Sequence, residues 1–220
     1  MRSILYLHGF ASGPNSAKVR ALRALLAPDG IELNAPDLNA PSFEKLDFEA
    51  NVRRATDAGR AIPPSAIVGS SLGALIALEV VRRGIRKPLV LLAPALGVVD
   101  QWITRIPEGD PVVVYNYARE RDTPIHRAFF EQMRHVDSDR NNPPVPVTLI
   151  MGRNDESVPF DRVAAVWKQW QDSGQLAAGS RFVESAEGDH GLTAFADILA
   201  REIRQAVQLG SGMLEPSRES

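Results

Sequence analysis

One short motif in this sequence could place a nucleophilic serine: the run Gly-Ser-Ser-Leu-Gly at residues 69–73. A Gly-x-Ser-x-Gly run holds its central serine on a tight turn between a strand and a helix, where glycine neighbours relieve the crowding around a strained backbone. The run Ala-Ile-Val at 66–68 is typical of a buried strand, and the apolar stretch after the motif is typical of a buried helix. This context favours Ser71 as a nucleophile over the alternative, a glycine-rich turn that only caps a helix.

A serine hydroxyl is a weak nucleophile at neutral pH, so it needs a histidine that takes its proton and a carboxylate that orients this histidine. Of the four histidines in the chain, His190 follows the last expected strand and precedes the last expected helix. That position is third in the order serine, acid, histidine that accompanies this type of turn. We therefore predict that His190 is the general base, the alternative being a helix-capping surface histidine.

The other three histidines are not expected to transfer protons. His126 and His135 fall in a long segment between two expected strands, where solvated helix positions account for them. His8 follows the first expected strand, and we interpret it as a buried ring that hydrogen-bonds the backbone and shapes the loop.

The acid is expected after the strand that precedes the His190 loop. A strand ending at Met151 is followed there by a glycine turn and then by Asp155, which we predict to be the acid. The alternatives, in decreasing order of preference, are Glu156, Asp161 and Asp189.

An oxyanion that forms during attack on an acyl group needs backbone N–H donors. Leu72 follows the nucleophile and supplies one donor, at a helix N-terminus that adds partial positive charge. Phe10, in the loop after the first expected strand, supplies the other. The predicted chemistry is acyl transfer to water through an acyl-Ser71 intermediate, with no metal and no organic cofactor.

Short apolar runs alternate with longer helical patterns along the chain, which predicts an α/β protein with a parallel sheet and helices on both faces. The expected strands are 4–7, 31–35, 66–69, 88–92, 147–151 and 181–184. The expected helices are 14–27, 43–61, 71–83, 159–174 and 192–209. We expect one domain over 1–209, followed by a flexible tail at 210–220.

Residues 94–146 interrupt this alternation and are far longer than a usual connection in α/β units. Two groups of apolar residues with helical spacing, around Trp102 and Phe129, predict a small helical cap and not a second domain. The aromatic residues of this cap segment (94–146) either line an apolar acyl pocket or form the core of the cap itself.

The composition limits the classes of partner. A net charge of −2 over 220 residues gives no polyanion-binding signature, so nucleic acid is not an expected partner. The absence of cysteine excludes disulfides, thiolate-bound metals and a cysteine nucleophile. The N-terminal apolar run is too short for a signal peptide, and no window approaches the roughly 18 apolar residues of a membrane span, so we expect a cytoplasmic location.

Two stretches carry a family resemblance: Leu-Tyr-Leu-His-Gly-Phe-Ala-Ser-Gly-Pro-Asn-Ser-Ala-Lys at 5–18 and Val-Gly-Ser-Ser-Leu-Gly at 68–73. They resemble the small bacterial esterases of the YqiA type within the α/β-hydrolase superfamily. Residues 153–159 and 187–190 are similar to the acid and histidine loops of that superfamily. The resemblance implies an α/β-hydrolase fold with a minimal, all-parallel sheet in the order 2-1-3-4-5-6 and the site at the carboxyl ends of the strands.

The same resemblance implies roles for individual residues. Catalysis would be carried by Ser71, Asp155 and His190, with the amides of Phe10 and Leu72 as oxyanion donors. The chain departs from the family at Ala74, where a second glycine is common, and at 93–95, where Ala-Pro-Ala replaces Asn-Pro-Ala. The second departure affects the expected details of the pocket.

The reaction that we favour is hydrolysis of a carboxylic ester in a small-molecule acyl substrate. The same three residues could instead cleave thioesters, amides or carbon–carbon bonds, and the fold could serve a binding protein without turnover. The sequence leaves these alternatives open, together with the acyl chain length and the oligomeric state.

Overall fold

A six-stranded parallel sheet forms the centre of the computed structural model, which describes residues 2–106, 108–138, 143–174 and 176–212. The strand order is β2-β1-β3-β4-β7-β8, the predicted order, and all neighbouring strands are parallel. The strands are β1 (Arg2–Leu7), β2 (Ile31–Asn34), β3 (Ala66–Ser70), β4 (Leu89–Leu92), β7 (Val147–Gly152) and β8 (Arg181–Ser185). Every residue of β3, β4 and β7 is buried, as expected of parallel strands that are covered on both faces.

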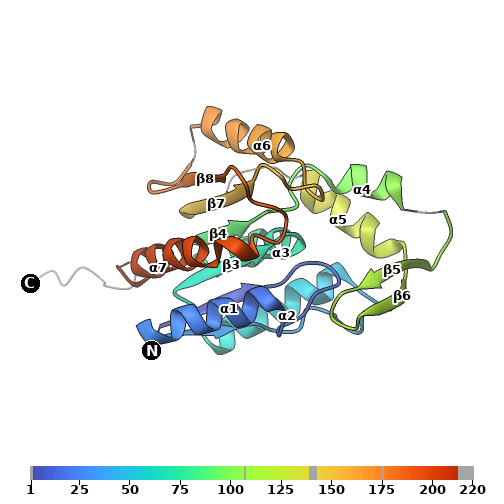
Figure 1. Cartoon of the computed structure of the whole chain (residues 1–220), viewed down its shortest axis with the longest axis horizontal. Helices are drawn as coiled ribbons and strands as arrows, with labels where there is room; N and C mark the ends of the chain where they lie inside the picture. The colour runs from blue at the N-terminus through green and yellow to red at the C-terminus, as the bar shows by residue number, and fades with distance from the viewer. Residues whose placement is uncertain (1, 107, 139–142, 175, 213–220) are drawn as a thin grey trace, which may run out of the picture.

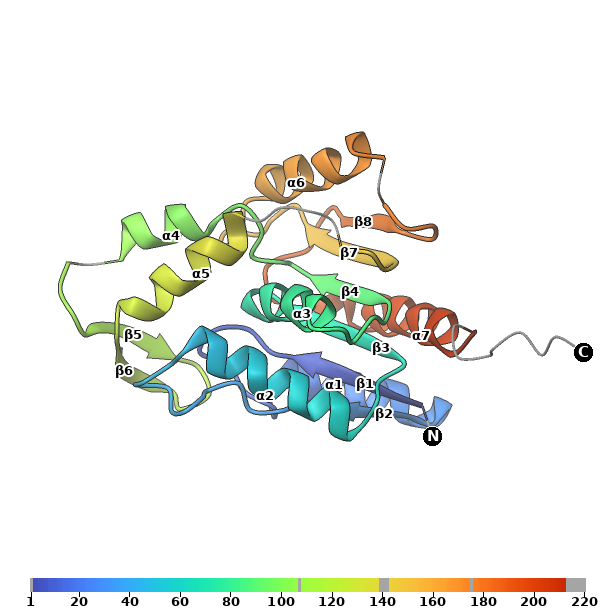
Figure 2. The same cartoon turned by 180° about the vertical axis from the view of Figure 1, so that it is seen from behind.

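Helices cover both faces of the sheet, which confirms the predicted layer arrangement. The helices of the core are α1 (Ala17–Leu26), α2 (Phe48–Ala61), α3 (Leu72–Arg82), α6 (Phe160–Asp172) and α7 (Ala196–Gly212). Helices α1 and α7 lie in front of the sheet in Figure 1, and α2 and α3 lie in front of it in the reverse view of Figure 2. Short 3₁₀ turns follow α1 at Ala27–Asp29 and precede α7 at Thr193–Phe195. Within the described residues, no helix is long and apolar enough to cross a membrane.

Helices α1 and α2 begin later than predicted because a capping side chain sets the first turn of each. Helix α1 begins after Ser16, whose side chain accepts a hydrogen bond from the Val19 N–H. Helix α2 begins after Asp47, whose Oδ1 accepts from the Ala50 N–H at 2.7 Å. Apolar periodicity alone extended both helices into the preceding loops, whereas the cap residue fixes the boundary.

Helix α7 begins at Ala196, after the 3₁₀ turn, and ends at Gly212, so it begins and ends later than predicted. Residues 210–212 therefore do not belong to a tail. Gly210 is buried, and a Cβ on it would lie 1.8 Å from the Ser65 carbonyl oxygen. The absence of a side chain at Gly210 therefore allows the helix end to approach the chain before β3. The rest of the expected tail, 213–220, lies outside the described residues.

The cap segment contains two helices and a β-hairpin, so the prediction of a purely helical cap was incomplete. Its elements are α4 (Val99–Arg105), β5 (Val112–Asn116), β6 (Arg121–Ile125) and α5 (Ala128–Ser138). Strands β5 and β6 pair antiparallel as a separate two-stranded sheet. In Figures 1 and 2 the cap segment lies beyond the carboxyl ends of the central strands. The helical spacing of its aromatic residues did not indicate these short strands.

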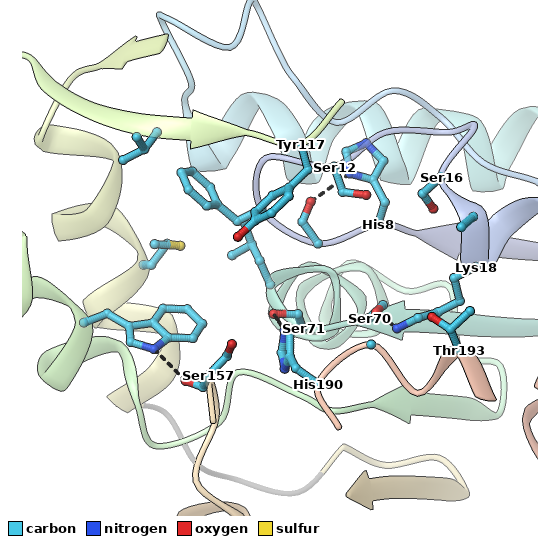
Figure 3. Close-up of a pocket in the computed structure, with 18 of the residues that line it drawn as sticks. His8, Ser12, Ser16, Lys18, Ser70, Ser71, Tyr117, Ser157, His190 and Thr193 are labelled. Carbon is cyan, nitrogen blue, oxygen red and sulfur yellow. Dashed lines mark hydrogen bonds between the residues drawn. The ribbon is translucent and has the colours of Figure 1, made fainter. Parts of the chain in front are cut away.

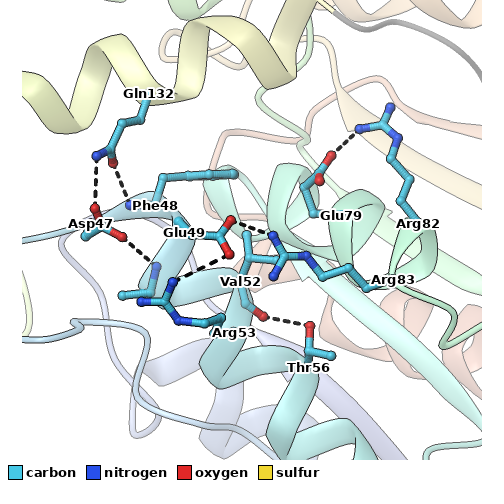
Figure 4. Close-up of polar contacts among 11 residues, drawn as sticks. Asp47, Phe48, Glu49, Val52, Arg53, Thr56, Glu79, Arg82, Arg83 and Gln132 are labelled. Carbon is cyan, nitrogen blue, oxygen red and sulfur yellow. Dashed lines mark hydrogen bonds and ion pairs between the residues drawn. The ribbon is translucent and has the colours of Figure 1, made fainter.

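Hydrogen bonds attach the cap segment to the N-terminus of α2. The Gln132 side chain, on α5, accepts from the Phe48 N–H at 2.7 Å and donates to Asp47 Oδ2 at 3.0 Å (Figure 4). An ion pair between Glu49 and Arg83 then joins α2 to the end of α3. The cap is therefore tied to the core helix that also flanks the sheet.

Candidate active site

Ser71 lies on the sharp turn between β3 and α3, as predicted. Its backbone has φ 53° and ψ −118°, a conformation that residues other than glycine rarely adopt. A Cβ on Gly69 would lie 2.6 Å from the Ala74 Cα, and a Cβ on Gly73 would lie 2.0 Å from the Leu7 carbonyl oxygen. Both glycines of the motif are therefore required by close backbone contacts, and α3 packs directly against β1 at this point.

We expect Gly73→Ala to lower the free energy of unfolding by about 3 kcal/mol, because the new methyl group would collide with backbone atoms of β1 that cannot easily move. Urea unfolding measures this change. Gly13→Ala is the matched control, since a Cβ there would lie 3.6 Å from the Ala118 Cβ, an ordinary contact. Equal stability of the two variants would contradict the packing argument.

Ser71, His190 and Asp155 form a continuous hydrogen-bonded chain. His190 Nε2 lies 3.1 Å from Ser71 Oγ, and His190 Nδ1 lies 2.8 Å from Asp155 Oδ2. The three residues follow β3, β8 and β7, so the parallel sheet brings together side chains that are distant in the sequence. Figure 3 shows the His190 ring beside Ser71 at the pocket floor.

The surroundings of Asp155 determine which nitrogen of His190 carries the proton. The Asp155 side chain is completely buried, and its Oδ1 accepts from the N–H groups of Ser157 at 2.9 Å and Val158 at 2.7 Å. A carboxylate can only accept, so Nδ1 of His190 must donate to Oδ2. Nε2 of the neutral ring is then free to accept the Ser71 proton.

The alternative acids of the sequence make no hydrogen bond with the His190 ring. Glu156 and Asp161 are exposed, and Asp189 Oδ1 instead accepts from the Leu192 N–H at 2.7 Å. That hydrogen bond closes the turn that carries His190. Asp189 therefore shapes the loop, while Asp155 lies against the ring.

Two glycines, whose contact the sequence analysis did not predict, hold the acid and histidine loops together. A Cβ on Gly152 would lie 2.1 Å from the Gly188 carbonyl oxygen. The Asn154 N–H donates to this oxygen at 2.9 Å, and the Arg153 N–H donates to the Ser185 carbonyl oxygen at 2.9 Å. The signal was present in the sequence as a glycine in each loop, but only the pairing of β7 with β8 shows that they meet.

The loop after β1 lies directly against Ser71. A Cβ on Gly9 would lie 3.3 Å from the Ser71 Cβ and 3.9 Å from Oγ, so the backbone leading to the Phe10 amide is beside the hydroxyl. Phe10 and Leu72 line the same pocket as Ser71 and His190. The Phe10 ring packs against the ring of Phe129 with centroids 6.0 Å apart, so the cap segment fixes the side chain of this loop.

The remaining histidines that the structure describes lie outside the hydrogen-bonded chain of Ser71, His190 and Asp155. His8 is buried; its Nε2 accepts from the Leu38 N–H at 2.9 Å, and its Nδ1 lies 2.9 Å from the Gly9 carbonyl oxygen. His8 therefore shapes the loop after β1, as predicted. His126 is exposed, as expected, but it lies between β6 and α5 and not on a helix, where it pairs with Asp110. The side chain of His135 lies outside the described residues.

A pocket of about 660 Å³ opens above Ser71 between the sheet and the cap segment. The cap contributes apolar residues to its wall, among them Trp102, Val114, Phe130 and Met133. The Trp102 Nε1–H donates to the Ser157 carbonyl oxygen at 3.2 Å, which links α4 to the acid loop (Figure 3). Some cap aromatic residues thus line the pocket, while the buried Phe129 belongs to the hydrophobic core that the cap shares with the rest of the domain. Among the described residues, no group of three or more His, Asp or Glu side chains is placed to hold a metal ion.

Comparison with known proteins identifies the family. The sequence model of the uncharacterised protein family UPF0227 matches residues 3–207. The chain belongs to this family. The match confirms the YqiA-type resemblance that the motifs of residues 5–18 and 68–73 indicated. None of the curated proteins compared with the chain matches it significantly.

Solved structures of low sequence identity share the fold. Mouse alpha/beta hydrolase domain-containing protein 10 has a TM-score of 0.73 at 20% identity, covering 94% of this chain and 89% of that one. Est1E from Butyrivibrio proteoclasticus has a TM-score of 0.71 at 17% identity, covering 96% and 88%. Monoacylglycerol lipase from Paleococcus ferrophilus has a TM-score of 0.72 at 16% identity, covering 94% of each chain. This chain therefore has the α/β-hydrolase fold that the sequence predicted.

Proposed function

We propose that this member of UPF0227 is a serine hydrolase that cleaves carboxylic esters through an acyl-Ser71 intermediate. The observation that carries the proposal is the hydrogen-bonded chain from Ser71 Oγ through His190 to the buried Asp155. Its position at the floor of a pocket with an apolar wall fits a small-molecule acyl substrate. Fold relatives that are named as an esterase or a lipase agree with this chemistry.

The geometry supports a two-step reaction. His190 Nε2 accepts the Ser71 proton as Oγ attacks the ester carbonyl, and the amides of Phe10 and Leu72 stabilise the oxyanion that forms. His190 then gives the proton to the leaving alcohol, which leaves an acyl-Ser71 ester. Water attacks this ester with the same histidine as base, which releases the acid and restores the serine.

A fluorophosphonate probe should modify the native protein at Ser71 alone, because the probe reacts with an activated serine oxygen and not with an ordinary hydroxyl. Mass spectrometry of the digested protein locates the adduct. Protein unfolded in urea is the control and should not react, since unfolding separates Ser71 from His190. No labelling of native protein would favour the alternative, a binding protein that keeps the fold without turnover.

The leaving group and the acyl chain can be determined with matched substrates. Esters, thioesters and amides of the same acyl group compare reaction classes, and a series of acyl lengths measures the depth of the pocket. We expect esters to be cleaved faster than the matched amides, because an alcohol leaving group depends less on protonation by the histidine than an amine leaving group does. If kcat/KM were higher for the thioester or the amide, we would assign that reaction to the same three residues instead of ester hydrolysis.

A further inference from the structure

One cationic side chain enters the pocket next to Ser71 without a carboxylate partner. Lys18 lies in the first turn of α1, and its Nζ donates to Ser70 Oγ at 3.0 Å (Figure 3). Among the described residues, no carboxylate oxygen lies within 4.0 Å of Nζ, and Ser70 is its hydrogen-bond partner. An ammonium group has three N–H donors, and the described part of the chain accepts from one of them.

The charge on Lys18 is not balanced by its immediate neighbours. Burial lowers the pKa of the Lys18 amine to about 8, while the carboxylates of Asp189 and Asp155 act in the opposite direction from a longer distance. The amine is therefore mostly protonated at neutral pH. Burial raises the pKa of the nearby Tyr6 phenol, so that group stays neutral and supplies no counter-charge.

Helix stability does not explain a lysine at this position. The N-terminus of a helix carries partial positive charge, so a cation in the first turn is unfavourable there. The first turn of α1 contains no acidic residue that would offset it. The partial positive charge of the first turn and the charge of the Lys18 ammonium instead lie at the same end of the pocket. This arrangement suits an anion.

The two ends of the pocket differ in chemistry. Figure 3 shows Lys18, Ser70 and Thr193 on one side of Ser71, with hydroxyl groups next to the ammonium, and Ser157 on the other side. The Ser157 side is where Trp102 and the apolar wall of the cap segment lie. Ser71 is therefore located between a polar, cationic end and an apolar end.

We propose that the polar end, formed by Lys18, Ser70, Thr193 and the first turn of α1, binds a carboxylate carried by the substrate. The apolar end then holds its hydrocarbon part, and the scissile ester lies between them at Ser71. A single negative charge fits better than a phosphate dianion, because one ammonium faces the anion and the Asp189 and Asp155 carboxylates oppose further negative charge. This inference rests on the proposed function and specifies the substrate class of the same site.

Arg105 also lines the pocket, from α4 in the cap segment. Its side chain is exposed whereas Lys18 is half-buried, so solvent and salt screen the charge of Arg105 more than that of Lys18. We therefore assign the recognition of the carboxylate to Lys18, and the test treats Arg105 as the competing candidate.

The experiment compares esters that differ only in charge. One pair is p-nitrophenyl hemiglutarate and its neutral methyl ester, with the carboxylate on the acyl side; the other is butyrylglycolate and its methyl ester, with the carboxylate on the alcohol side. For at least one pair, wild-type kcat/KM should be about tenfold or more higher for the anion, as expected of a charge-assisted hydrogen bond. In Lys18→Met this ratio should fall to about 1 or below, because only the repelling carboxylates remain.

Three further variants test whether the preference for the anionic ester depends on the charge of Lys18. Lys45→Met makes the same substitution at an exposed lysine outside the pocket and should keep the wild-type ratio. Arg105→Met should keep most of the ratio. Lys18→Gln keeps a donor for Ser70 and removes the charge, so it replaces Lys18→Met if that variant does not fold.

The outcomes separate the inference from the proposed function on which it rests. A wild-type ratio near 1 for both pairs, an unchanged ratio in the Lys18 variants, or a ratio abolished by Arg105→Met would each overturn the inference. Fluorophosphonate labelling of Ser71 in every variant shows that the serine is still activated. If wild-type protein neither reacts with the probe nor cleaves any of the four esters, the proposed function fails instead.

Discussion

Replacing Ser71 by alanine should lower kcat for ester hydrolysis by roughly three or more powers of ten. The substitution removes the oxygen that attacks the carbonyl, and the acyl-enzyme can no longer form. Residual turnover would come from substrate binding and the oxyanion donors, with water in place of the serine. Steady-state hydrolysis of a short-chain chromogenic ester measures the effect.

Ser70→Ala is the contrast for this experiment, because it removes a hydroxyl from the adjacent position. Ser70 Oγ accepts from Lys18 Nζ and is not bonded to His190. We expect its loss to change kcat by at most about tenfold, a change below 1.4 kcal/mol in the barrier. Equal rates for wild type and Ser71→Ala would exclude a covalent serine mechanism, whereas an equal loss in both variants would point to disruption of the turn.

Local sequence was sufficient to predict the nucleophile turn, because its determinants lie within five consecutive residues. The close contacts of Gly69 and Gly73 show why the motif has this form. The order of the strands made Asp155 and His190 predictable as well, since parallel strands bring their carboxyl ends to one edge of the sheet. The structure places His190 against Ser71 and Asp155 against His190, and their catalytic roles stay a proposal.

Features that depend on long-range packing could not be predicted from periodicity. The hairpin of β5 and β6 contains a proline and exposed residues on an edge, so its strand pattern is weak. The attachment of Gln132 to the start of α2 joins residues 84 and 85 positions apart. The sequence analysis assigned no role to Lys18, and only the structure shows that its half-buried amine lies in the pocket beside Ser70.

The tautomer of His190 gives the second large prediction, for Asp155→Asn. Asp155 Oδ1 accepts two backbone N–H groups, so the asparagine carbonyl oxygen should occupy that place and its amide nitrogen should face His190. An amide nitrogen donates, so Nδ1 of the ring would have to accept and the ring proton would move to Nε2. Nε2 would then point a proton at Ser71 and could not remove one.

We therefore expect kcat of Asp155→Asn to fall by about 10³–10⁴ while KM changes little, because Asp155 does not line the pocket. Fluorophosphonate labelling should slow in parallel, since it needs the same proton transfer. Glu156→Gln changes the adjacent, exposed carboxylate in the same way and should leave both rates unchanged. A kcat within tenfold of wild type would indicate that another carboxylate is the acid. Asp161→Asn and Asp189→Asn would then identify which one.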